Sequence, residues 1–247
     1  MELDIIKRKT NGIPHMSFAE AQEMTSFILE NQIHNILELG FCHGVSTCYF
    51  AGALDKLGEG HIITIDLEST RFEKPNIESL LNDLDLKKYV TVFYEPTSYI
   101  WRLLIMLEEH PIPQFDLCYV DGAHNWFTDG FAFFLIDKML RPGGWVVFDD
   151  LDWTYDTSPS LKNTPFVKNM PWDERTTSQV RKVYELLVKP HPDYGSFLVR
   201  NGRAFARKMP ATAVGIPDTI RQEIIYVKEQ VGLGAIISKV VKKIIGL

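Results

Sequence analysis

The hydrophobic positions of this chain form short apolar runs, which are separated by longer stretches where apolar residues recur at helical spacing. The first run, 35–39, ends at Gly40, and the second, 61–65, ends at Asp66. A segment of helical length, 45–57, separates the two runs. Short apolar runs bounded by turn residues are typical of buried strands, so this region predicts a strand, a helix and a second strand.

The same alternation continues toward residue 148. It predicts further helices near 76–86, 97–109 and 126–140, and further strands near 89–94, 115–120 and 145–148. Ahead of the first strand, Ser17 and Glu20 have the spacing of a capping box, which indicates a helix over 17–31. Strands that alternate with helices predict a mostly parallel sheet with helices on both faces.

The end of this pattern differs, because Asn201 and Gly202 separate two segments of strand composition, 196–200 and 203–207. An Asn-Gly pair suits the positive backbone angles of a type I′ turn, so the segments predict a hairpin. The predicted fold class is therefore α/β, a Rossmann-like three-layer sandwich. Its mostly parallel seven-stranded sheet ends in an antiparallel hairpin.

Two segments lack the alternation of strands and helices. Residues 151–178 hold aromatic and proline residues without a clear period, which is typical of a lid or substrate loop; a buried irregular insertion is the alternative. Residues beyond about 216 are amphipathic. We expect a domain over 1–210 and an amphipathic helical tail over 211–247. The tail packs on the domain, on a second subunit of a homo-oligomer, or peripherally on an anionic membrane.

Composition narrows the class of protein. The chain is 45% hydrophobic and 23% charged, as in an ordinary globular protein, and its net charge of -6 argues against nucleic acid as a partner. Cys42, Cys48 and Cys118 form no CxxC pair, which favours reduced, buried thiols over a disulfide framework or a structural zinc site. No signal-peptide or bilayer-spanning pattern occurs, so we expect a cytoplasmic location.

Polar residues gather where the predicted strands end. These are the loop from Gly40 to Gly44, then Asp66, Asp121 and the pair Asp149-Asp150. In an open parallel sheet, ligands bind beyond the carboxyl ends of the strands. We therefore expect these side chains to converge on one ligand site.

The glycine loop and Asp66 indicate the kind of ligand. A dinucleotide motif requires glycines at 40, 42 and 45, but positions 42 and 45 hold Cys42 and Val45, which argues against a pyrophosphate. Asp66 suits the two hydroxyls of a ribose, although it could instead cap the next helix. Together these features favour an adenosine ligand without a pyrophosphate.

The polar strand ends belong to longer motifs, which are Glu38-x-Gly40-x-x-x-Gly44, Asp66, Asp121-Gly122-Ala123-His124, and Arg141-Pro142-Gly143-Gly144 leading into Phe148-Asp149-Asp150. Over roughly residues 30–207, these motifs resemble those of the class I S-adenosylmethionine-dependent methyltransferases. More narrowly, they resemble the branch of macrocin-type sugar O-methyltransferases and cephalosporin-hydroxylase-like proteins.

The resemblance implies a set of cofactor contacts. Glu38, Gly40 and Gly44 would surround the methionine part of S-adenosylmethionine, and Asp66 would hold the ribose. Ser46 and Ser98 are further candidate contacts, with ordinary helix-start roles as the alternative. Asp121 is a candidate contact of the cofactor and also a candidate ligand of the metal.

The resemblance also implies a metal and a base. Asp121, Asp149 and Asp150 offer the oxygen ligands that Mg²⁺ or a similar divalent cation prefers. Alternatively, Asp149 and Asp150 cap the loop, and many methyltransferases of this fold need no metal. His124 would accept the proton of the acceptor hydroxyl, or would only hydrogen-bond the loop.

The expected function is S-adenosylmethionine-dependent O-methylation, assisted by a divalent metal, of a hydroxylated small molecule such as a sugar or an aromatic natural product. Trp126, Trp153, Tyr155 and Trp172 could line the acceptor site. Two alternatives remain open: a hydroxylase-like oxidative enzyme of the same branch, and a non-catalytic S-adenosylmethionine-binding module.

Overall fold

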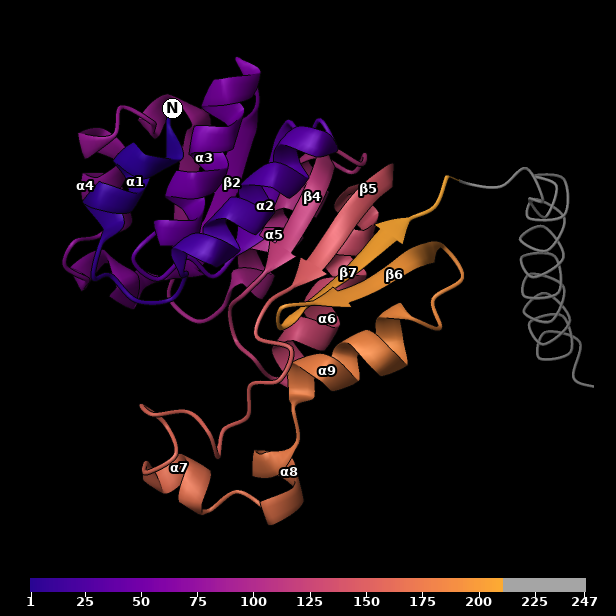
Figure 1. Cartoon of the computed structure of the whole chain (residues 1–247). Coiled ribbons are helices and arrows are strands. Elements are labelled where there is room, and N and C mark those ends of the chain that lie inside the picture. The colour runs from indigo at the N-terminus through magenta and orange to yellow at the C-terminus, as the bar shows by residue number, and fades with distance from the viewer. Residues whose placement is uncertain (211–247) are drawn as a thin grey trace, which may run out of the picture. The chain divides into compact units, whose positions relative to one another are not determined.

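In the computed structural model, which describes residues 1–210, seven strands form one sheet in the order β3-β2-β1-β4-β5-β7-β6 (Figure 1). The strands are β1 (Asn35–Leu39), β2 (His61–Leu67), β3 (Val90–Glu95), β4 (Phe115–Val120), β5 (Leu140–Phe148), β6 (Tyr194–Arg200) and β7 (Arg203–Lys208). Strands β1 to β5 pair in parallel, and β7 lies antiparallel to both β5 and β6. The predicted fold class is confirmed. The tail predicted over 211–247 lies outside the described residues.

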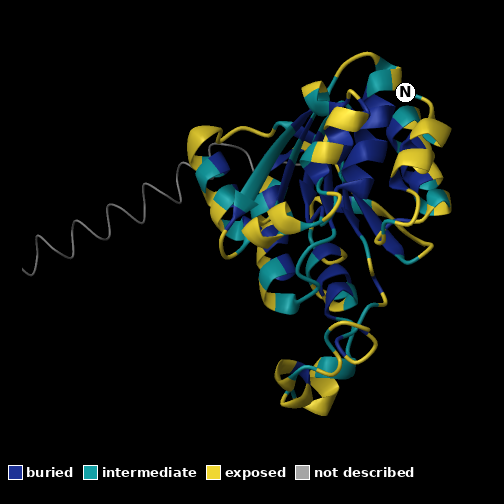
Figure 2. Cartoon of the chain, turned by 90° about the vertical axis from the view of Figure 1, so that its left-hand side faces the viewer, coloured by how far each residue is buried: buried dark blue, intermediate teal, exposed yellow. Residues whose placement is uncertain are grey.

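Helices cover both faces of the sheet (Figure 1). One face carries α1 (Leu3–Thr10), α2 (Phe18–Glu30), α3 (Val45–Leu57) and α4 (Ile77–Asp83), and the other carries α5 (Tyr99–Glu109), α6 (Trp126–Met139) and α9 (Gln179–Val183). A π-helical turn, Tyr184–Val188, continues α9, and short 3-10 turns occupy Glu68–Phe72 and Lys87–Tyr89. Figure 2 shows the buried residues concentrated in the sheet and on the inner sides of these helices.

Alternate residues of β1 face the two helical layers, because successive side chains of a strand point to opposite faces. Ile36 packs in the core shared with α1 to α4, whereas Leu37 and Leu39 pack in the core shared with α5 and α6. Glu38 follows this alternation and meets the first turn of α3, where the hydroxyl of Ser46 donates to it. The alternation of side chains along β1 thus places the carboxyl group of Glu38 on the face of the sheet that α2 and α3 cover.

Several predicted elements agree with the structure residue for residue. The strands over 35–39 and 115–120 and the helix over 45–57 have the predicted bounds. Ser17 caps α2 in a complete capping box with Glu20. The hairpin turn also forms, with φ of 50° at Asn201 and 77° at Gly202. Each of these elements depends mainly on a pattern of neighbouring residues.

The bounds of β5 differ from the prediction. The sequence predicted a helix near 126–140 and a strand near 145–148, with Arg141–Gly144 between them, but β5 begins at Leu140 and includes this segment. The pairing of β4 with β5 shifts between Phe115, which pairs with Leu140, and Leu117, which pairs with Trp145. The irregular pairing accommodates the extra residues, so the strand starts before the Pro-Gly-Gly turn.

Residues 151–178 leave the sheet after β5 and hold two short helices, α7 (Pro165–Lys168) and α8 (Trp172–Thr176) (Figure 1). Leu151 and Val167 are buried anchors, whereas Phe166 and Trp172 are 64% and 71% exposed. Most of the segment is exposed or half-buried (Figure 2), which does not agree with a buried insertion.

Two further findings concern the thiols and the membrane. Within the described residues, Cys48 and Cys118 are buried free thiols, as predicted, and Cys42 is half-buried. No helix within residues 1–210 is both long enough and apolar enough to cross a membrane.

Candidate active site

The strand order reverses between β1 and β4, and a cavity of about 430 Å³ lies at the carboxyl ends of these strands. Such a reversal is where open α/β sheets bind their ligands, because the connecting loops diverge there. The cavity is lined by Pro14, His15, Met16, Gly40, Phe41, Cys42, Val45, Ser46, Asp66, Thr70, Asp121, Gly122, His124 and Asp150. Predicted site residues from four strand ends, those of β1, β2, β4 and β5, therefore share one cavity.

The glycine loop after β1 is shaped by Gly40 and Gly44, whose φ angles are +90° and +88°. Gly44 precedes the first residue of α3 and packs against Ile77. A Cβ atom at Gly40 would overlap the backbone carbonyl of Asp121. Glycine is therefore required at position 40 both for its backbone angle and for the close approach of two strand ends.

Replacing Gly40 with alanine is expected to lower the free energy of unfolding by about 3 kcal/mol or more. Alanine is unfavourable at a left-handed backbone angle, and its Cβ would overlap the backbone of Asp121. Gly58→Ala is the matched control. Its φ is +86°, but a Cβ there meets nothing within 4 Å, so only about 1 kcal/mol should be lost. Urea unfolding measures both, and equal losses would contradict the role of the Asp121 contact.

Asp66, at the end of β2, binds the backbone of the same loop. Its Oδ2 accepts hydrogen bonds from the N–H groups of Phe41 at 2.8 Å and Cys42 at 2.7 Å, and its Oδ1 accepts one from Leu67 at 2.6 Å. The carboxylate lines the cavity. It therefore fixes the course of the glycine loop where a ligand would lie against it.

Glu38 has a different place from the one the resemblance implies. It is fully buried and outside the cavity lining, and it accepts hydrogen bonds of 2.6 Å from the hydroxyls of Ser46, Thr47 and Thr64. Burial raises the pKa of Glu38 to about 7, against the opposing effect of the three hydroxyl donors. Glu38 thus ties β1, β2 and α3 together beneath the cavity.

Of the other predicted cofactor contacts, some line the cavity and some do not. Ser46 lines the cavity and also donates to Glu38. Ser98 caps α5 by accepting from the N–H of Ile100 at 3.2 Å, and it does not line the cavity. The structure therefore brings Gly40, Ser46, Asp66 and Asp121 to the cavity, and it leaves Gly44 and Ser98 outside the lining.

Two carboxylates and an imidazole meet on one side of the cavity. His124 Nε2 lies 3.4 Å from Asp121 Oδ1 and 3.1 Å from Asp150 Oδ2. The φ angles of His124 and Asp150, +53° and +51°, turn these side chains toward each other at the ends of β4 and β5. Ligand atoms of the three residues lie within 4.8 Å of one another.

The charges in this cluster change its titration. Burial lowers the pKa of His124, but Asp121 and Asp150 outweigh that effect and raise it to about 10. The contact with His124 lowers the pKa of Asp150, whereas burial raises that of Asp121. At neutral pH, and without a bound cation, His124 is an imidazolium between two carboxyl groups.

Asp149 does not join this cluster. Its Oδ2 accepts hydrogen bonds from the hydroxyl of Tyr119 and, at 3.2 Å, from Nε of Arg203, while its Oδ1 accepts from the N–H of Asp150 at 2.8 Å. Burial raises the pKa of Asp149. Of the three predicted metal ligands, the structure therefore brings Asp121 and Asp150 together with His124 and engages Asp149 elsewhere.

The donor set fits a divalent cation. Asp121 and Asp150 offer carboxylate oxygens, and His124 Nε2 is buried and not aligned for a hydrogen bond with either of them. Two carboxylate oxygens, with room for solvent or substrate oxygens, suit a hard divalent ion. Nε2 of His124 is then left for a polar group of a bound ligand, which would satisfy this buried nitrogen.

The predicted aromatic wall forms only in part. The ring of Trp153 lies 5.0 Å from that of His124 and 4.9 Å from that of Tyr155, measured between ring centroids. Tyr155 also lines a second cavity of about 570 Å³ together with Phe166 of α7. Trp126 and Trp172 line neither of these two cavities.

Sequence reasoning missed Arg203, whose side chain is fully buried and contacts three carboxylates. Besides Asp149, it lies 3.3 Å from Glu20 and 3.3 Å from Glu23 of α2. An arginine directly after a turn carries no signal of burial, because a strand that starts there could equally face solvent. His15 was missed for a similar reason: it precedes α2 without any motif.

Comparison with known proteins agrees with this architecture. Residues 37–151 match the model of a family described as "Methyltransferase domain". Among solved structures, the O-methyltransferase TomG from Streptomyces achromogenes, involved in tomaymycin synthesis and in complex with SAM, is 20% identical, with a TM-score of 0.59 over 84% of this chain and 89% of that chain.

Two further structures are similar. An O-methyltransferase from Bacillus cereus in complex with SAH is 19% identical, with a TM-score of 0.58 over 83% of this chain and 88% of that one. The SAH-bound methyltransferase PaMTH1 from Podospora anserina is 17% identical, with a TM-score of 0.60 over 84% and 87%. A search of curated proteins found no match.

The fold is that of the methyltransferase structures named above, and the cavity lies where its strand order reverses. Over residues 37–151 the chain matches the methyltransferase-domain family, which supports the predicted enzyme class, methyltransferase.

Proposed function

We propose that this protein transfers the methyl group of S-adenosylmethionine to a hydroxyl oxygen of a small molecule, with a divalent cation such as Mg²⁺ held beside the acceptor. The observation that carries the proposal is the shared cavity, where the glycine loop and Asp66 face the cluster of Asp121, His124 and Asp150. The similar structures named above are O-methyltransferases or hold SAM or SAH, which supports the same reaction.

In this proposal the glycine loop and Asp66 hold the cofactor. S-Adenosylmethionine supplies an electrophilic methyl group on a sulfonium. A carboxylate has about four lone-pair positions, and three backbone N–H groups already bind Asp66. The remaining capacity, on the cavity side, suits a ribose hydroxyl. Gly40 lets the backbone lie close to the ligand.

His124 receives the proton of the acceptor at Nε2, the buried nitrogen that lacks a hydrogen-bond partner. Only a neutral imidazole can do so, whereas the two carboxylates raise the pKa of His124 to about 10. A divalent ion bound by Asp121 and Asp150 supplies positive charge that offsets the carboxylates and lowers the pKa of a nearby hydroxyl. The base and the ion site are therefore proposed together.

The acceptor would lie beside Trp153 and Tyr155, because aromatic faces pack well on sugar or aryl rings. The second cavity, which Tyr155 also lines, gives the room that a ring-bearing small molecule needs. The net charge of -6 disfavours nucleic acid as the acceptor. A cytoplasmic location belongs to the same proposal.

The cluster does not favour the oxidative alternative. Non-haem iron oxygenases use two histidines and one carboxylate, whereas His124 is the one histidine in this cluster and two carboxylates accompany it. A His124→Gln variant separates the proposed enzyme from a non-catalytic binding module, because only an enzyme has turnover to lose.

Calorimetric titration with S-adenosylhomocysteine tests the proposal. We expect micromolar binding to the wild-type protein and at least about tenfold weaker binding, about 1.4 kcal/mol, to Asp66→Asn, because the charged hydrogen-bond acceptor at the cavity is lost. Asp83→Asn, an exposed aspartate at the end of α4, is the control and should bind as the wild type does. No binding to the wild type with either Mg²⁺ or a chelator would overturn the proposed function.

A further inference from the structure

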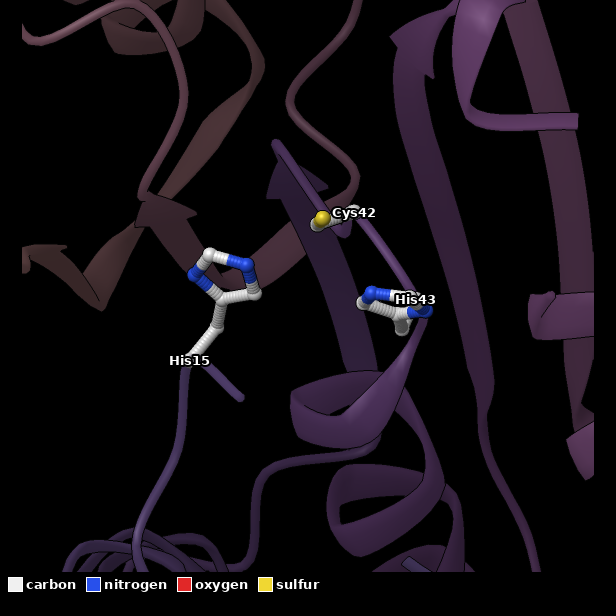
Figure 3. Close-up of side chains that lie close together, drawn as sticks. All are labelled: His15, Cys42 and His43. Atoms are coloured by element: carbon white, nitrogen blue, oxygen red, sulfur yellow. The ribbon is translucent and has the colours of Figure 1, made fainter. Parts of the chain in front are cut away.

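A thiol and two imidazoles meet at the rim of the cofactor cavity, apart from the cluster around His124. Cys42 and His43 belong to the loop between β1 and α3, and His15 belongs to the segment before α2. Figure 3 shows the three side chains gathered with the sulfur of Cys42 between the two rings. One ligand atom from each residue lies within 4.8 Å of the others.

The spacing is close to that of a metal site. Zinc binds sulfur at about 2.3 Å and imidazole nitrogen at about 2.0–2.1 Å, so its tetrahedral ligands lie about 3.4–3.8 Å apart. Contraction by about 1 Å would bring the present cluster to that geometry. Because His15 is exposed and its ring stacks loosely on that of His43 at 6.1 Å, a rotation of its side chain can supply the movement.

His43 is oriented as a metal ligand would be. Its Nδ1 lies 2.7 Å from the backbone oxygen of Pro75, and since a carbonyl only accepts, the ring proton is on Nδ1. The lone pair is then on Nε2, which lies 3.5 Å from Glu73 Oε2. A backbone carbonyl that holds the second nitrogen is the usual support of a ligating histidine.

We propose that Cys42, His15 and His43 form a binding site for a thiophilic divalent cation such as Zn²⁺, and that an ion there opposes cofactor binding. The first part follows from the donor set, because a thiolate with two imidazoles selects zinc-like ions, whereas the oxygen-rich cluster of Asp121 and Asp150 selects harder ones. The thiol gives its proton to solvent as the ion binds.

The second part follows from where the ligands lie. His15 and Cys42 both line the cavity that holds Asp66, and the N–H of Cys42 donates to Asp66. An ion that joins His15 to Cys42 would fasten the segment before α2 across the rim of this cavity. Zinc and S-adenosylmethionine would then compete for one rim. This part rests on the proposed function, whereas the existence of the cation site does not.

Titration of the full-length protein with Co²⁺ tests the site, because a thiolate ligand produces a near-ultraviolet charge-transfer band that oxygen ligands do not. Excess Mg²⁺ occupies the carboxylate cluster during the titration. The wild type is expected to show the band, with d–d absorption in the visible that Zn²⁺ displaces. Cys42→Ser should lose the band, and the buried thiols Cys48 and Cys118 should not replace it.

Histidine variants complete the test. His15→Asn, which tolerates the φ of 90° at that position, and His43→Ala should each weaken Co²⁺ binding at least tenfold. His110→Asn, a change at an exposed histidine after α5, should leave binding unchanged. No charge-transfer band in the wild type, or a band that persists in a folded Cys42→Ser variant, overturns the site.

The effect of Zn²⁺ on cofactor binding is measured separately, by titration with S-adenosylhomocysteine. Zn²⁺ should weaken S-adenosylhomocysteine binding at least tenfold in the wild type and not in Cys42→Ser. Unchanged affinity in the wild type overturns the coupling. If the protein binds no S-adenosylhomocysteine at all, the proposed function fails, and the cobalt result still decides the site.

Discussion

Replacing His124 with glutamine is expected to lower the turnover number for methyl transfer by about 10²–10⁴, the usual contribution of a general base. Glutamine keeps a polar side chain of similar size beside Asp121 and Asp150 but cannot accept and release a proton. Binding of S-adenosylhomocysteine should stay within about twofold of the wild-type value, because it does not use the proton. Initial rates with an accepted substrate and calorimetry measure the two quantities.

His110→Gln is the control for the loss of a histidine, because His110 is exposed at the end of α5 and lines neither of the two cavities. Its turnover number should equal that of the wild type. A His124→Gln variant with full activity would contradict the assignment of the base. Loss of cofactor binding together with turnover would instead indicate that His124 only supports the structure of the cavity.

Replacing Arg203 with methionine is expected to lower the free energy of unfolding by about 3–5 kcal/mol, the cost of breaking a buried ion pair from one side. The guanidinium is fully buried and contacts Asp149, Glu20 and Glu23. Without it, Asp149 stays buried, with the hydroxyl of Tyr119 as its remaining side-chain partner. Urea unfolding followed by circular dichroism measures the loss.

Arg207→Met on the same strand is the matched control. Arg207 is exposed, and its Nε donates to the carbonyl of Gly143 at 2.9 Å, so less than about 1 kcal/mol should be lost. Adding Asp149→Asn to Arg203→Met should recover part of the stability, because the carboxyl group that has lost its ion-pair partner is removed with it. Equal losses for the two arginine variants would mean that the ion pairs of Arg203 add little.

The pair Asp149-Asp150 illustrates how a predicted site is divided by the fold. The two residues are adjacent in sequence and were expected to act together on one metal. Past the end of β5, Asp149 faces Tyr119 and the antiparallel strand β7, where Arg203 contacts it. Asp150 adopts a positive φ and turns to His124 instead. Because both residues are aspartates, the sequence does not indicate that their side chains point in different directions.

Glu38 is a second case. Its position in the motif implies a contact with the cofactor, and its alternation along β1 predicts burial on one face. The three hydroxyl groups that satisfy it come from α3 and β2, up to 26 positions away in sequence. The carboxyl group of Glu38 therefore joins these elements through hydrogen bonds and does not line the cavity.

The sequence by itself determined the order of strands and helices, the hairpin at Asn201-Gly202, the glycine loop and the set of polar strand ends. These depend on apolar periodicity, turn preferences and helix capping, which act between residues a few positions apart. Only the tertiary structure decided that Asp149 pairs with Arg203, that Glu38 lies beneath the cavity and that His15 reaches Cys42. Those contacts join segments that are far apart along the chain, and the packing of the sheet against its helices selects among them.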